Sequence, residues 1–150
     1  MRVVIQNVTE ASCRINNKIV GEISRGFCIL VGFTHDDTKE IVEKMVNKIV
    51  SLRVFNDENG KTNLSLKDID GKILSISQFT LYASVKDGRR PSFVNAMRPE
   101  EATKMYDYFN ECLRNTGFEV QTGVFGADMK ISLINDGPFT TIVDSKELGL

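Results

Sequence analysis

The sequence is poor in histidine and cysteine, the side chains on which many hydrolytic and metal sites depend. It contains one histidine, His35, and three cysteines, Cys13, Cys28 and Cys112, which are far apart and form no CxxC pair. No GxSxG elbow, HExxH helix or Walker loop is present. His35 lies beside two aspartates, so we expect a solvated loop histidine rather than a member of a Ser–His–Asp triad. We therefore expect no metal or other cofactor, and proton transfers that use backbone groups, hydroxyls, water or the substrate itself.

The chain also lacks an excess of charge and any long apolar run. Its 19 basic and 20 acidic residues give a net charge of −1, which argues against a protein that holds nucleic acid by overall electrostatic attraction. No apolar stretch approaches the roughly 18–20 residues of a membrane span, and Met1–Ile5 is too short for the apolar part of a signal peptide. We expect no membrane partner. The odd cysteine count indicates reduced, packed thiols in a cytoplasmic protein.

No linker, low-complexity tract or internal repeat divides the sequence, so we expect one domain over residues 1–150. Runs that are rich in β-branched residues and bounded by turn residues predict strands. These are Arg2–Gln6, Ala11–Ile15, Lys18–Ile23, Phe27–Phe33, Leu52–Phe55, Lys72–Phe79, Phe118–Thr122, Lys130–Ile134 and Phe139–Val143. Asn16-Asn17 predicts a tight hairpin turn, and Asp57–Gly60 predicts a loop with its glycine at a positive φ.

Two amphipathic helices are predicted. Thr38–Val50 and Pro99–Thr116 both carry apolar residues at helical spacing, which we interpret as faces that pack on the core. Asp37 and Glu40 form a capping pattern before the first helix, and the second opens with proline and ends before Gly117. Many strands with two such helices indicate an α+β protein: a single domain with a curved, barrel-like mixed β-sheet and two helices packed outside.

Two segments interrupt this pattern in a way that suggests a site. In Ser77–Leu81, hydroxyl and amide side chains end an apolar strand, where a buried strand would continue with Val or Ile. A strand end can aim N–H groups and a hydroxyl at one point, as an oxyanion site requires, but an edge strand with Thr80 facing solvent explains the pattern equally well. Asn135–Thr140 predicts a hairpin turn between two strands, and its glycine would also allow close approach to a ligand.

Two further loops are open to more than one interpretation. Lys86–Phe93 is basic and ends in an aromatic residue, so it is suited either to bind phosphates and stack on a base or simply to be a solvated charged loop. Phe125–Met129 places small residues between an aromatic ring and a thioether, which is compatible with a turn or with the wall of a pocket.

Together these segments resemble the D-aminoacyl-tRNA deacylase family. The SQFTL sequence at Ser77–Leu81 and the NxGPxT pattern at Asn135–Thr140 occur in the family's order, and the combination is specific where either motif alone is weak. The similarity runs nearly end to end and also includes Met1–Val8, Leu52–Phe55, Asn63–Leu66, Gly88–Phe93 and Val120–Met129. The intact SQFTL sequence favours the D-specific branch, because a related deacylase group carries a different sequence there.

The resemblance implies a homodimeric enzyme that hydrolyses the ester between a D-amino acid, or more weakly glycine, and the 3′-terminal adenosine of tRNA. Its active sites would lie at the subunit interface. Gly137-Pro138 would be a cis dipeptide inserted into the partner's pocket, where its carbonyls bind the α-ammonium and its backbone excludes an L side chain. Ser77, Gln78, Phe79 and Thr80 would line the ester side, and Phe125, Ala127 and Met129 would lie near the adenosine, whose 2′-hydroxyl would take part.

Two positions depart from the family's pattern. Asn7 replaces an arginine that helps to orient the Gly-Pro unit, and Thr62 replaces a methionine, so both bear on chiral strictness. Thr80 is either a nucleophile or a positioning group, and positioning is favoured because no base is visible to activate it. Two other functions stay open: a deacylase of L- or achiral mischarged tRNA, and a tRNA-binding module without catalysis, which the near-neutral charge disfavours.

Overall fold

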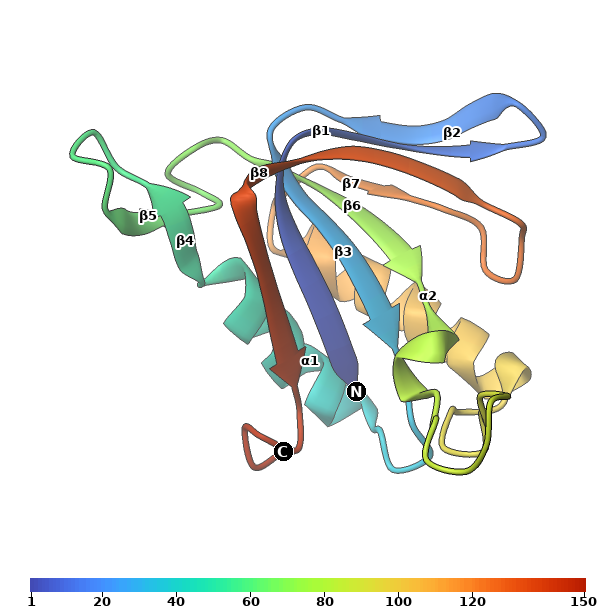
Figure 1. Cartoon of the computed structure of the whole chain (residues 1–150). Coiled ribbons are helices and arrows are strands. Elements are labelled where there is room, and N and C mark those ends of the chain that lie inside the picture. The colour runs from blue at the N-terminus through green and yellow to red at the C-terminus, as the bar shows by residue number, and fades with distance from the viewer.

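The sheet is organised around β1 (Arg2–Ile15), which pairs with three other strands in this computed structural model of residues 1–150. The first half of β1 pairs with β3 (Gly26–Gly32), the second half pairs with β2 (Lys18–Ile23), and β8 (Lys130–Asp144) runs antiparallel along both halves. β6 (Lys72–Ser77) then adds in parallel to β3, and β7 (Val120–Thr122) adds in parallel to β6. The result is a mixed sheet that curls, so that β2 and the second half of β1 lie over β6 and β7 (Figure 1).

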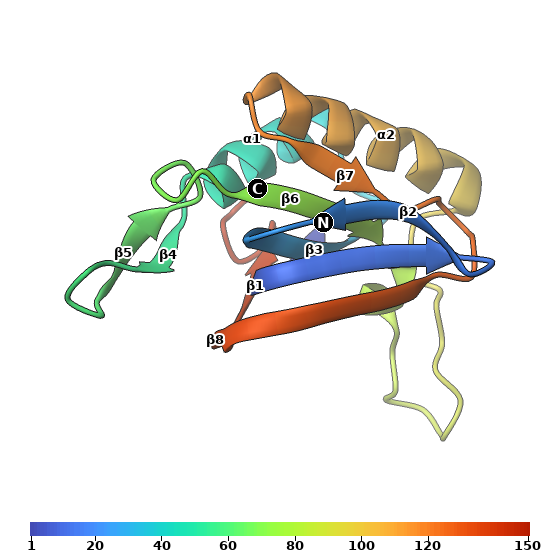
Figure 2. The same cartoon turned by 90° about the horizontal axis from the view of Figure 1, so that it is seen from above.

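The two helices cover one face of this sheet. α1 (Lys39–Val50) and α2 (Pro99–Asn115) lie side by side against it, and neither is long and apolar enough to cross a membrane (Figure 2). β4 (Arg53–Asn56) and β5 (Thr62–Ser65) form a separate two-stranded finger, and η1 (Phe79–Tyr82) is a short 3-10 turn after β6. The predicted α+β class, with a curved mixed sheet and two outer helices, is confirmed.

Apolar residues pack on both faces of the sheet because side chains alternate along each strand. Along β3, Phe27, Ile29 and Val31 face the helices, whereas Cys28 faces the inside of the curl. The cluster inside the curl is the smaller of the two and consists of Val8, Ala11, Cys13, Ile23, Cys28, Leu74 and Ile76. Burial raises the pKa of the Cys28 thiol to about 12, with a further contribution from Cys13, so this group is neutral and packs as an apolar side chain.

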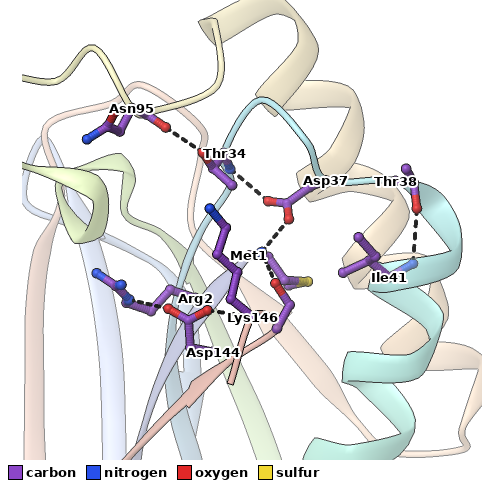
Figure 3. A network of polar contacts seen from close by, with 10 residues as sticks. Met1, Arg2, Thr34, Asp37, Thr38, Ile41, Asn95, Asp144 and Lys146 are labelled. Atoms are coloured by element: carbon purple, nitrogen blue, oxygen red, sulfur yellow. Dashed lines mark hydrogen bonds and ion pairs between the residues drawn. The ribbon is translucent and has the colours of Figure 1, made fainter. Parts of the chain in front are cut away.

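The two helix starts differ in how well they were predicted. α1 is capped by Thr38, whose Oγ1 accepts a 3.3 Å hydrogen bond from the Ile41 N–H, so the capping role predicted for Asp37 is wrong. Asp37 instead accepts from the Thr34 N–H at 2.7 Å and binds the α-ammonium of Met1 (Figure 3). α2 begins at a proline and is followed by Gly117 at a φ of +92°, as predicted.

Two long strands continue through polar residues at which the sequence predicts a break. Residues 2–15 form one strand rather than two, and so do residues 130–144. The predicted breaks contain residues of low β propensity, but the ladder between β1 and β8 continues on both sides of them. β5 was not predicted at all.

The predicted turns are confirmed by their backbone angles. The hairpin turn at Asn16-Asn17 has φ values of 49° and 65°, and Gly60 lies at a φ of +73° as expected.

Arg2 joins the ends of β1 and β8. Its Nε donates to Oδ2 of Asp144 at 2.8 Å, and the Lys146 N–H donates to Oδ1 at 2.9 Å (Figure 3). Burial of the Asp144 carboxyl disfavours its charged form, but the hydrogen bonds from Lys146 and Arg2 and the charge of Arg2 outweigh this effect and lower its pKa. The carboxylate therefore stabilises the fold in its ionised form.

We expect this carboxylate to contribute to the loss of stability in acid. Because the folded-state pKa lies below the unfolded value, the contribution is complete above about pH 5 and is lost as the pH falls through the folded-state pKa. Asp144→Asn should lower the free energy of unfolding at pH 7 by about 1–2 kcal/mol, a figure that allows for the 39% exposure of Arg2. Urea titrations between pH 7 and pH 3 measure this, with Asp128→Asn, which removes an exposed pair, as control. If the free energy of unfolding of Asp144→Asn fell between pH 7 and pH 3 as much as that of wild type, the assignment would be contradicted.

Candidate functional site

The SQFTL segment leaves the sheet in a sharp turn. The Gln78 N–H donates to the Val31 carbonyl of β3 at 2.7 Å, and the chain then winds into η1, where the Leu81 N–H donates to the Gln78 carbonyl at 3.3 Å. The strand predicted over Lys72–Phe79 therefore ends at Ser77. The hydroxyl and amide side chains of the segment therefore lie on a turn that follows the strand, and not on the edge strand that was the alternative prediction.

Two features hold the turn against the sheet. A Cβ on Gly32 would lie 2.8 Å from the Gln78 carbonyl oxygen and 3.2 Å from Leu81 Cβ, so only glycine allows this close approach. On the other side the Arg2 guanidinium donates to the Leu81 carbonyl at 2.8 Å and lies 5.2 Å from the centre of the Tyr82 ring. Arg2 thus fixes η1 as well as the end of β8, a role that the sequence did not reveal.

The exposed side of the turn presents several hydrogen-bonding groups. The N–H groups of Phe79 and Thr80 have no acceptor within the chain. The Thr80 hydroxyl accepts from the Gln78 side-chain amide at 2.5 Å and forms no hydrogen bond with a basic side chain. His35 lies elsewhere and donates from Nε2 to the Val94 carbonyl at 2.8 Å, so it forms no triad. No group of three or more His, Cys, Asp or Glu side chains is placed to hold a metal ion.

The NxGPxT motif forms a bulge in β8 rather than the predicted hairpin turn. Thr140 pairs with Gln6 and Asn135 pairs with Val8, so the residues between Asn135 and Thr140 are opposite Asn7 alone. The ladder resumes in the same direction on both sides, which a hairpin does not allow. Gly137 and Pro138, joined by a cis peptide bond, are exposed at the outer end of this bulge.

The other motif residues hold the bulge in shape. The side-chain amide of Asn135 donates to Thr140 Oγ1 at 2.9 Å, and its oxygen accepts from the Phe139 N–H at 2.9 Å. Gly137 has a φ of +135°, and a Cβ there would lie 2.8 Å from the Phe139 nitrogen, so a larger residue would disturb the loop. Asn135, Gly137 and Thr140 of the motif therefore each help to maintain the shape of the bulge.

The structure does not bring the two motifs together within one chain. Ser77 pairs with Val31 of β3, whereas Asn7, opposite the bulge, pairs with Phe27, four residues away along β3. Three strand spacings also separate β6 from β8. With about 3.3 Å per residue and about 4.8 Å per strand, the two motifs are roughly 20 Å apart. They also lie at opposite ends of the sheet in Figure 1.

The loop that carries Phe125, Ala127 and Met129 lies beside the SQFTL end of the sheet. The Gly123 N–H donates to the Ser75 carbonyl at 3.2 Å, so the chain continues from β7 alongside the last residues of β6. Phe125 packs at 6.1 Å from the Tyr106 ring, and Met129 joins the small cluster inside the curl. The loop that carries Phe125–Met129 thus begins beside the residues of β6 that lead into Ser77–Thr80.

A buried polar group under this loop was not predicted. The Tyr106 hydroxyl of α2 donates to the Ser75 carbonyl at 2.7 Å, which ties the helix to the strand that ends in SQFTL. Burial raises the pKa of Tyr106, and its hydrogen bonds with Asn110 and Ser75 only partly oppose this. The Asn110 Oδ1 and Ser75 Oγ atoms are buried without a partner. An asparagine on the apolar face of α2 is the signal that would have identified this group.

Asn7 makes none of the contacts expected of the family's arginine. It is 4% exposed, and its side-chain amide donates to the Val54 carbonyl of β4 at 2.7 Å, while its Oδ1 has no partner. No hydrogen bond joins its side chain to Gly137 or Pro138. Thr62 begins β5 in the finger and donates to Asn56 Oδ1 at 3.4 Å.

Solved structures of the same fold support this arrangement of elements. One described as c-Myc DNA unwinding element binding protein has a TM-score of 0.90 and 41% sequence identity, and the match covers 96% of this chain and 98% of that chain. Another, described as a probable eukaryotic D-amino acid tRNA deacylase, has a TM-score of 0.84 at 21% identity and covers 95% and 97% of the two chains. The second likeness shows a common fold alone.

Sequence comparison adds the family. Proteins named D-aminoacyl-tRNA deacylase from Lactobacillus gasseri and Bacillus cytotoxicus are 56% identical over 144 residues and 53% identical over 146 residues. These matches cover 96% and 97% of this chain and 99% and 100% of those proteins. The family described as D-Tyr-tRNA(Tyr) deacylase matches residues 4–144. The chain therefore belongs to the D-Tyr-tRNA(Tyr) deacylase family, in agreement with the resemblance of its SQFTL and NxGPxT motifs.

Proposed function

We propose that the protein hydrolyses the ester bond between a D-amino acid and the 3′-terminal adenosine of tRNA, and so returns mischarged tRNA to use. The observation that carries this proposal is the SQFTL turn with its free donors, in a chain that matches the family from residue 4 to residue 144. Because aminoacyl-tRNA is used where proteins are made, the proposal also places the enzyme in the cytoplasm, where its free cysteines stay reduced.

The turn is suited to stabilise the charge that develops during ester hydrolysis. Water adds to the ester carbonyl carbon and gives up a proton, and negative charge grows on the carbonyl oxygen. The bond to the ribose oxygen then breaks as that oxygen takes up the proton that the water released. The N–H groups of Phe79 and Thr80 supply fixed donors for this oxygen, and Ser77 and Gln78 complete the ester side. Because the Thr80 hydroxyl meets an amide rather than a base, it positions the ester, and the ribose 2′-hydroxyl assists the attacking water.

A second copy of the chain completes the site. Gly137 and Pro138 are exposed on a bulge that is held at both ends but lies remote from the SQFTL turn of its own chain. Inserted into the partner's pocket, their carbonyls would bind the substrate's α-ammonium through charge-assisted hydrogen bonds. This arrangement makes the protein a homodimer whose two sites each contain residues from both subunits. The terminal adenosine would lie against Phe125, Ala127 and Met129.

Chirality then follows from where the side chain points. With the ammonium and the ester carbonyl both held, a D side chain extends to solvent, whereas an L side chain meets the backbone of Gly137-Pro138. Discrimination of ~10³ corresponds to about 4 kcal/mol, which a clash with rigid backbone supplies more readily than the loss of one methylene contact. Glycine has no side chain to exclude, so it is a weak substrate. Relaxed chirality is the second candidate function, and it is favoured because the Asn7 side chain donates its hydrogen bond to the Val54 carbonyl and none to Gly137 or Pro138.

Matched D-tyrosyl-, L-tyrosyl- and glycyl-tRNA separate these candidates. We expect D-tyrosyl-tRNA to be deacylated ~10³-fold faster than the L form, with glycyl-tRNA between them, because only the L side chain clashes. Release of radiolabelled amino acid measures all three rates. Comparable D and L rates would favour the relaxed deacylase, and binding without release of any amino acid would favour a tRNA-binding module.

Substitutions in the turn separate backbone donors from the hydroxyl. Thr80→Ala should keep single-turnover deacylation within roughly tenfold of wild type, because its hydroxyl only positions the ester. Phe79→Pro removes one N–H at the first residue of η1, where proline is tolerated, and should fall about 10²–10³-fold below Phe79→Ala, which controls for the lost ring. A complete loss in Thr80→Ala, or equal rates for Phe79→Pro and Phe79→Ala, would refute this division of roles.

Mixing two inactive variants tests the shared site. Gly137→Ala damages the bulge and Phe79→Pro damages the turn, so each homodimer should be nearly inactive. If the bulge acts on the partner's turn, each mixed dimer contains one undamaged site, and equal co-expression should restore about a quarter of wild-type activity. Separately tagged subunits allow the mixed dimer to be purified and measured. No recovery in the purified mixed dimer would show that both motifs act within one chain.

A further inference from the structure

A basic arm extends from the SQFTL end of the molecule and is not used by the site described above. We define the arm as residues Val85–Pro91. Its base is closed by a reciprocal pair of backbone hydrogen bonds between Ser84 and Ser92, both 2.8 Å. Every residue of the arm is exposed, and Figure 2 shows the yellow-green loop reaching away from the helices and beyond the body of the sheet.

The arm carries positive charge in a chain that is otherwise negative. Lys86, Arg89 and Arg90 with Asp87 give it a net charge of +2. Because the whole chain has a net charge of −1, the remaining residues carry −3, which is −1 minus +2. None of the three cations is paired with a carboxylate or a side chain of the protein. They are therefore free to bind an anionic partner, and guanidinium groups bind phosphate in a bidentate manner.

Contacts at its base connect the arm to the ester turn. Phe93, just beyond the arm, packs its ring edge-to-face on Phe79 with centroids 5.0 Å apart. The next residues are also held. His35 donates to the Val94 carbonyl at 2.8 Å, and Thr34 donates to the Asn95 carbonyl at 2.7 Å, as Figure 3 shows. A loop of this length that goes out and returns reaches about 10 Å from its base. The base of the arm is thus fixed next to the turn that is proposed to hold the ester.

We propose that the arm binds backbone phosphates of the tRNA next to its 3′-terminal adenosine. The inference rests on the proposed function, since it assigns the nucleotides beyond the ester to a surface of their own. Phosphate contacts carry no sequence information, so the arm would serve tRNAs of any amino acid. Because the phosphates do not change during ester hydrolysis, the arm binds ground state and transition state alike and acts on KM rather than kcat.

The test compares two triple variants on two substrates. The arm variant is Lys86→Gln with Arg89→Gln and Arg90→Gln. The control variant, Lys48→Gln with Lys67→Gln and Arg114→Gln, removes the same charge at the far end of the helices, since the 17 residues of α2 place Arg114 about 20 Å from the arm's base. D-tyrosyl-tRNA carries the phosphates, whereas D-tyrosyl-adenosine carries the same ester without any phosphate.

We expect the arm variant to raise KM for D-tyrosyl-tRNA roughly tenfold or more at 0.1 M salt with little change in kcat. The slope of log KM against the logarithm of the salt concentration should be smaller by about 2 in the arm variant, which is about 0.7 for each of the lost contacts to single-stranded RNA. Hydrolysis of D-tyrosyl-adenosine should match wild type, and the control variant should match wild type on both substrates.

Three results would overturn the proposal. An equal loss on both substrates would show that the arm supports the ester site or the dimer, and an unchanged salt dependence would show that it meets no phosphate. A loss of the same size in the control variant would show a general charge effect. If wild type releases D-tyrosine from neither substrate, the proposed function fails. The arm is then judged separately by the salt dependence with which uncharged tRNA binds to wild type and arm variant.

Discussion

The long ladder between β1 and β8 is the interaction on which the rest of the molecule depends, because it is anchored on both sides of a bulge. Arg2 to Gln6 and Val8 to Arg14 both pair with β8, so the few residues between Asn135 and Thr140 have nowhere to move along the sheet. The same β1 also pairs with β3, which orients β6 and its SQFTL turn. One strand therefore sets the positions of two motifs that are more than fifty residues apart in the sequence.

The helices contribute to the site through the strand that they cover. α2 reaches the sheet with Tyr106, which holds the Ser75 carbonyl two residues before the SQFTL turn and supports Phe125 on its other side. Arg2 approaches the same turn from the opposite direction through Leu81. The exposed donors of Phe79 and Thr80 thus rest on a base that is bonded from two elements, which gives the rigidity that the proposed stabilisation of the ester's transition state requires.

Much of the architecture could be predicted from local patterns, and the rest depended on contacts between distant residues. Both helices, the turn at Asn16-Asn17 and the α+β class follow from spacing and turn chemistry. The bulge in β8 does not, because Asp-Gly-Pro between two apolar runs has the composition of a hairpin turn, and only pairing with β1 shows that the strand continues. The sequence could locate SQFTL and NxGPxT as unusual segments, but their separation within one chain is a property of the sheet register.

The bulge presents main-chain atoms at its tip, since Gly137 has no side chain and Pro138 has only its ring. Every amino acid has a main-chain carbonyl, so a substitution cannot remove these atoms. It can change only where they point, through the shape of the loop. Gly137 controls that shape at the tip, and Asn135 and Thr140 control it from the base of the loop, at a distance from whatever the tip touches. Selection on such a surface therefore acts mainly through the residues that hold the loop in shape.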